Sequence, residues 1–227
     1  MPLVRALVGL LAALSLECAA APFALQVGDV RLAFDIPPGF ADSMPTGSPR
    51  LQDLAESFTA ASNRVLVFAL SDADMRRFNG GDTPELRQYL LAVTPRAFEQ
   101  ERITPAAFDA MLRDGLRALG TAPTDGDFAK ILEARPPGES TLLAELRRDA
   151  EAMAVMRGVR LPPPETGFFS AAKPSSYVLS TTSLILLRGK ALTLTVTTGY
   201  SSKADVEWLR ATTLRWIDEQ KRLNTAR

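Results

Sequence analysis

One serine and one lysine have a spacing that could support nucleophilic catalysis. Ser170 and Lys173 form an S-x-x-K pattern, in which a lysine amine one helical turn away takes the proton from the serine hydroxyl. Here Pro174 follows at once and two phenylalanines precede, which indicates a strand or loop. In a strand the two side chains would point to opposite faces. A Ser/Lys hydrolase using Ser170 and Lys173 is therefore the alternative function, and the companion K-T-G pattern is absent.

Two pairs of aspartates could offer oxygen ligands to a hard cation such as Ca²⁺. Asp72 and Asp74 form one pair, and Asp125 and Asp127 form the other. Neither pair continues into the series of ligands and closing glutamate of an EF-hand loop. Aspartates that precede helices usually cap them. We therefore expect N-terminal caps at these positions, and neither a metal site nor a cofactor.

The residue types that are missing exclude whole classes of reaction. The chain has no histidine, and its one cysteine is Cys18, close to the N-terminus. A Ser-His-Asp triad, an ordinary zinc site and a c-type haem attachment are therefore excluded. With 26 basic and 26 acidic residues, the chain also has no net charge with which to attract nucleic acid. The absence of histidine and of further cysteines is a stronger indication than any catalytic motif in the sequence.

The first twenty residues have the pattern of a secretory signal peptide. Arg5 precedes the apolar run 6–16, and small residues at 18–20 fit a signal-peptidase site. The run of about 11 residues is shorter than the roughly 20 needed to span a bilayer. We therefore expect cleavage near Ala20 and a periplasmic or secreted protein without a stable membrane span. Its partner would then be a protein in the periplasm.

A lipid-anchored form is the alternative for this N-terminus. Cys18 would then be acylated, and Leu16 stands where a lipobox has a leucine. Glu17, however, occupies the position where a lipobox has a small residue. The sequence therefore favours export without acylation.

The period of the apolar residues predicts an α+β domain over residues 21–227. Alternation with period two predicts hairpins at 23–36 and at 176–200, and the nearly continuous apolar run 64–70 predicts a strand buried on both faces. Residues 87–93 fit a strand, although 83–85 resemble a helix start, and the strand is favoured. Helices are expected from Ser48 and from Thr104, each of which precedes a proline. Residues 71–82 read as a polar loop and 167–172 as a further strand. Helices at 124–133 and 140–156 would make 121–164 a helical insertion in a largely antiparallel sheet flanked by helices.

The final helix, from about residue 202, carries an outward tryptophan. Val206, Leu209 and Trp216 belong to its apolar stripe, whereas Trp208 lies about 160–200° around the helix from Val206 and Leu209. Trp208 either packs under the segment 121–164 or anchors a partner protein. Because monomers seldom leave large apolar patches bare, packing is favoured.

The two ends of the domain carry a family resemblance. The first hairpin ends in I-P-P-G-F at residues 36–40, and the closing hairpin, 184–200, is followed by a helix. In these features the chain resembles the PsbP-like group of α+β domains, which includes the bacterial periplasmic DcrB type. The resemblance implies a single antiparallel sheet flanked by helices and a non-enzymatic accessory or binding role. It implies no catalytic residue that could be carried over.

Overall fold

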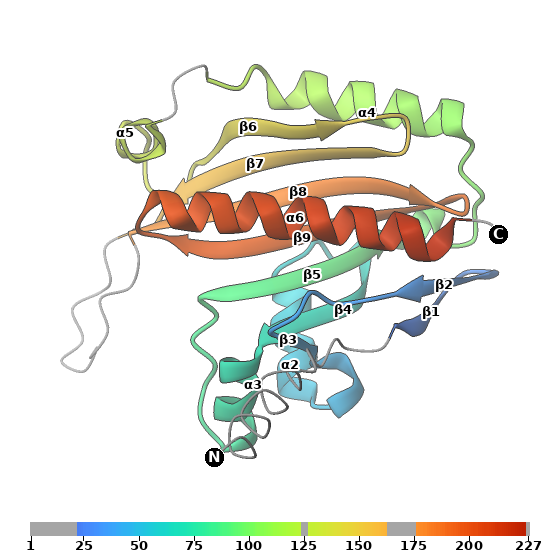
Figure 1. Ribbon diagram of the computed structural model, residues 1–227, viewed down its shortest axis with the longest axis horizontal. Helices are drawn as coiled ribbons and strands as arrows, with labels where there is room; N and C mark the ends of the chain where they lie inside the picture. The colour runs from blue at the N-terminus through green and yellow to red at the C-terminus, as the bar shows by residue number, and fades with distance from the viewer. Residues whose placement is uncertain (1–21, 124–126, 163–175, 226–227) are drawn as a thin grey trace, which may run out of the picture.

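The computed structural model describes residues 22–123, 127–162 and 176–225 (Figure 1). Its main feature is one antiparallel seven-stranded sheet in the order β3-β4-β5-β9-β8-β7-β6, and β1 and β2 form a separate hairpin. The strands are β1 (Phe23–Val27), β2 (Val30–Phe34), β3 (Phe40–Asp42), β4 (Asn63–Ser71), β5 (Gln88–Pro95), β6 (Ser140–Arg148), β7 (Ala152–Arg160), β8 (Tyr177–Leu187) and β9 (Lys190–Tyr200). The helices are α2 (Pro49–Ser57), α3 (Asp72–Asn79), α4 (Pro105–Leu119), α5 (Phe128–Glu133) and α6 (Lys203–Asn224). The predicted α+β fold with a largely antiparallel sheet is confirmed.

Each face of the sheet is covered by different elements. On one face, α6 lies across β8 and β9, and the β1–β2 hairpin covers the β4–β5 part, which gives the largest buried cluster. On the opposite face, α2 and α3 pack over β4 and β5, while α4 packs near the turn between β8 and β9. The chain therefore forms one sheet with a covering layer on each side. Among the described residues, no helix is long and apolar enough to cross a membrane.

The predicted hairpins at both ends are confirmed. Arg188 and Gly189 connect β8 to β9 with φ angles of 51° and 82°, as a two-residue hairpin turn with two left-handed residues requires. Gly28 in the first hairpin has a φ of 57°, and a Cβ there would lie 2.1 Å from the carbonyl oxygen of Glu99. Glycine is thus needed at position 28 for its conformation and for this close approach.

The helix predicted at 140–156 is wrong: this stretch forms the hairpin β6–β7. Two bulges in β6 leave Leu143 and Leu146 without partners in β7, so the apolar residues of β6 do not follow period two. The following strand, β7, has buried side chains on both faces and gives a nearly continuous apolar run. Because of these two departures, the apolar residues of 140–156 recur at intervals of three and four residues, as they would on one face of a helix. The segment 121–164 is therefore not a helical insertion, because its second half extends the sheet.

The polar stretch 71–82 is also not a loop, because it contains α3. Ser71 is the N-cap, and its hydroxyl oxygen accepts a hydrogen bond from the backbone N–H of Asp74 at 3.1 Å. The favoured strand at 87–93 and the helices after Ser48 and Thr104 are confirmed as β5, α2 and α4. The helix predicted at 124–133 begins at Phe128 as α5, and residues 124–126 lie outside the described part. The predicted strand 167–172 and signal peptide 1–20 also lie outside it.

Candidate functional site: a groove beside α6

Two adjoining hollows lie along one flank of α6, where residues 35–39, which connect β2 to β3, pass beside the helix. Both are lined by Pro37, Pro38 and Arg215, and each has a volume of about 140 Å³. The first hollow is also lined by Phe40, Trp208, Ala211 and Thr212. The second is also lined by Asp35, Ile36, Trp216 and Glu219. Because the hollows share three residues, they form one surface, which we call the α6 groove.

Two amide side chains of α6 hold the wall formed by residues 33–35. Asn224 accepts a hydrogen bond from the N–H of Ala33 at 3.0 Å and donates one to its carbonyl at 2.7 Å. One helical turn earlier, Gln220 makes the same pair of bonds with Asp35, at 3.3 and 2.9 Å. Four helical residues rise about 6 Å and two strand residues about 6.6 Å, so the two spacings match. The two amides therefore satisfy the backbone N–H and C=O groups of Ala33 and Asp35, as a neighbouring strand would.

Trp216 fixes the same wall from the buried side of the groove. Its indole N–H donates a hydrogen bond to the carbonyl of Asp35 at 2.8 Å. Its ring meets Phe34 edge to face, with centroids 5.9 Å apart, and only 2% of the residue is exposed. Beyond Asp35, Pro37 and Pro38 restrict the backbone because their φ angles are locked. The wall is thus positioned by the core before any ligand binds.

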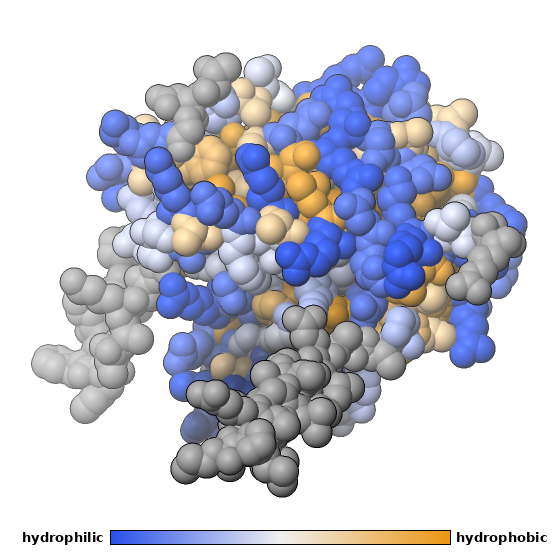
Figure 2. Space-filling view, viewed as in Figure 1, coloured by the Kyte–Doolittle hydropathy of each residue, from blue (hydrophilic) through white to orange (hydrophobic). Residues whose placement is uncertain are grey.

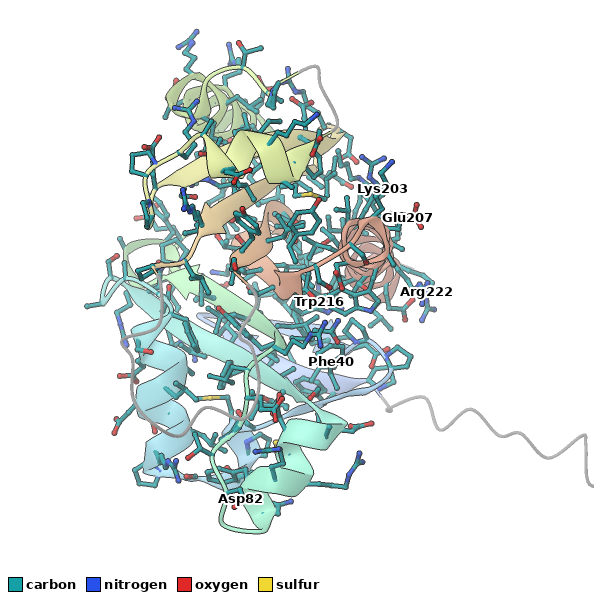
Figure 3. The ribbon with its side chains drawn as sticks, turned by 90° about the vertical axis from the view of Figure 1, so that its left-hand side faces the viewer. Phe40, Asp82, Lys203, Glu207, Trp216 and Arg222 are labelled. Atoms are coloured by element: carbon teal, nitrogen blue, oxygen red, sulfur yellow. The ribbon has the colours of Figure 1, made fainter. Side chains whose placement is uncertain are left out.

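Trp208 forms the aromatic end of the groove. Its indole is half-buried, and its ring centroid lies 6.1 Å from that of Phe40 in β3. The packing that we expected under residues 121–164 is therefore not the arrangement found, because the aromatic neighbour comes from the N-terminal part of the chain. Figure 3 shows Phe40 and Trp216 below α6, whereas Lys203 and Glu207 lie above it. Trp208 and Phe40 therefore border an open, largely apolar hollow.

Charged groups follow the aromatic end along the groove. Arg215, at the junction of the two hollows, is exposed and forms no ion pair with the described residues. At the far end, Glu219 accepts a hydrogen bond from Arg222 at 2.8 Å, and this bond lowers the pKa of Glu219. Burial raises the pKa of Asp35, and the Glu219 carboxylate adds to this effect. The groove is thus apolar, then cationic, then anionic.

The other flank of α6 is closed by an ionic network. The amine of Lys221 in α6 lies 2.9 Å from the Glu151 carboxylate and 3.4 Å from the Asp149 carboxylate. Both acidic residues lie in the turn between β6 and β7. Arg147 pairs with Asp149 and also with Asp218 of α6. Burial opposes ionisation of Asp149, but hydrogen bonds from the Glu151 N–H and Arg147 lower its pKa overall. Along the outer surface of the helix, Figure 2 shows hydrophilic residues interspersed with hydrophobic ones. The groove therefore lies on the flank of α6 that faces away from this ionic network.

The metal candidates that the structure describes belong to the starts of helices, where Ser71, not Asp72 or Asp74, is the N-cap of α3. Asp74 is 4% exposed and accepts a hydrogen bond from the N–H of Glu85 at 2.7 Å, while Asp72 is the first residue of α3. Asp127 caps α5 by accepting a bond from the N–H of Lys130 at 3.3 Å. No group of three or more potential metal ligands occurs in the described ranges. Asp125, Ser170 and Lys173 lie outside them.

Comparisons with known proteins add one structural neighbour. No protein-family model matches the chain, and no curated protein matches it. Among solved structures, the chain is similar to the Ran-binding protein Mog1p of Saccharomyces cerevisiae. The two are 10% identical, with a TM-score of 0.39, and the match covers 89% of this chain and 93% of Mog1p. A likeness of this degree carries no functional argument, and the resemblance to the PsbP-like group stays a prediction.

Proposed function

We propose that this chain is an exported, non-enzymatic accessory protein that binds a polypeptide partner in the α6 groove. The observation that carries the proposal is the half-buried Trp208 ring, which lies beside Phe40 in an open groove. Tryptophan in such positions often dominates the binding energy of protein interfaces, because it buries much apolar area with little loss of side-chain freedom. The groove therefore has a candidate anchor at one end.

The dimensions of the groove favour a peptide over a small molecule. Each hollow measures about 140 Å³, below the range of about 300–1,000 Å³ that is usual for small-molecule sites. Shallow hollows in a row instead suit successive side chains of an extended chain. The hydrogen bonds of Gln220 and Asn224, together with Pro37 and Pro38, hold one wall in place. Such preorganisation lowers the entropy cost of binding.

Export is the second part of the proposal, and it rests on the sequence. Arg5, the apolar run 6–16 and the small residues before position 21 form the signal-peptide pattern. The partner is then expected in the periplasm or outside the cell. The balanced charge of the chain agrees with a protein partner better than with nucleic acid.

Affinity capture from a periplasmic extract tests the proposed function. Wild-type protein should retain one or more polypeptides that Trp208→Ala loses, because the substitution removes the aromatic anchor. Glu207→Ala, next to Trp208 but directed to the other side of α6, is the matched control and should retain them. Melting curves of all three proteins verify that each is folded. Equal capture by wild type and Trp208→Ala would overturn the proposal.

A further inference from the structure

The α6 groove carries charges in a fixed order, and this order specifies its ligand further. We infer that the groove binds an extended peptide with an apolar side chain at Trp208, an acidic one at Arg215 and a basic one at Glu219 and Asp35. The inference rests on the proposed function, since it names the chemistry of the partner at the same site. Its basis is the sequence of lining residues along one flank of the helix.

The spacing along α6 is within side-chain reach of the spacing in an extended peptide. From Trp208 to Glu219 the helix rises about 16 Å, at about 1.5 Å per residue. The first and fifth residues of an extended chain are four steps apart and span about 13 Å, at about 3.3 Å per step. Side chains at its first, third and fifth positions point to the same side. With the first side chain at Trp208, the long acidic and basic side chains at the third and fifth positions must cover a remaining distance of roughly 3–4 Å each, because Arg215 and Glu219 lie about 10 and 16 Å along the helix from Trp208.

Charge complementarity favours the order apolar, acidic, basic from the aromatic end. Arg215 has no ionic partner among the described residues, so a ligand carboxylate would give it one. At the far end, Asp35 and Glu219 line the same hollow, and the Arg222 guanidinium pairs with Glu219 alone. A basic side chain there would relieve the repulsion between the two carboxylates. The opposite order would place like charges together at both positions.

Fluorescence anisotropy with two labelled peptides of identical composition tests the order. One contains Leu-Ser-Glu-Ser-Lys and the other Leu-Ser-Lys-Ser-Glu, each within neutral flanks and each also made in the reversed chain direction. The first order should bind about threefold to tenfold more tightly at low salt, because two exposed ion pairs distinguish the peptides. The preference should shrink as salt screens these pairs.

Charge-swapped variants provide the decisive comparison. Arg215→Glu combined with Glu219→Arg should reverse the preference between the two peptides. The pair Lys203→Glu with Glu207→Lys has the same four-residue spacing on the other side of α6 and should leave it unchanged. Equal binding of both peptides, or binding of neither, would overturn this inference. In that case the proposed function would still stand if Trp208→Ala abolished capture of a periplasmic partner. If Trp208→Ala left capture unchanged, both the inference and the proposed function would be overturned.

Discussion

Trp216→Ala is expected to lower the free energy of unfolding by about 3–5 kcal/mol, the usual cost of removing a buried tryptophan. Trp216 is 2% exposed and packs edge to face against Phe34. Alanine would leave a cavity between α6 and the β1–β2 hairpin and would remove the indole hydrogen bond to Asp35. Chemical denaturation monitored by circular dichroism gives this free energy directly.

Two further variants separate packing from other effects of Trp216. Trp216→Phe keeps most of the ring but not the indole donor, and should cost only about 1 kcal/mol. Asp35 would keep its bond from Gln220 in this variant. Thr195→Ala, at a partly exposed position on the sheet face away from α6, should cost less still. If Thr195→Ala destabilised the protein as much as Trp216→Ala, the assignment of the two sheet faces would be wrong.

Lys190→Met is expected to destabilise the protein by about 2–5 kcal/mol, the range for removing a charged donor and leaving buried acceptors unpaired. The Lys190 side chain is 1% exposed, and its amine donates to the carbonyls of Glu99 and Glu101 at 3.0 and 2.9 Å. It also lies 2.9 Å from the Asp29 carboxylate. One cation thus ties the start of β9 to the first hairpin and to the segment before α4.

Methionine is chosen at position 190 because it nearly preserves the length and volume of lysine. The loss then reports the amine and its bonds, with little contribution from a cavity. Lys203→Met, at an exposed position in the first turn of α6, is the matched control and should change stability by less than about 0.5 kcal/mol. Unchanged denaturation of Lys190→Met would show that these three contacts contribute no net stability.

The sequence predicts those elements of the fold whose apolar residues keep one period. Apolar residues alternate with threonines over 192–197 of the closing hairpin, and Leu209, Trp216 and Ile217 of α6 form the buried stripe that the helical period indicates. By contrast, β6 contains two bulges and β7 is buried on both faces, so neither alternates. Period alone then cannot distinguish a bulged hairpin from a helix. The error at 140–156 has this cause.

The groove could be predicted only in fragments. Trp208 stands out as an aromatic residue off the buried stripe, and 36–40 stands out through its two prolines and glycine. That these two features lie together depends on contacts between residues about 180 positions apart, such as Gln220 with Asp35. A signal was nevertheless present. Gln220 is a polar residue on a mostly apolar stripe, and a buried amide requires hydrogen-bond partners.

Site-specific photo-crosslinking in intact cells tests the groove most directly. A photoreactive residue at Thr212, inside the groove, should link the protein to a discrete polypeptide, and the additional substitution Trp208→Ala should abolish that product. The same residue at Glu207, directed away from the groove, should not form it. A product that forms equally from Glu207, or that persists without Trp208, would contradict the account of the α6 groove as the binding site.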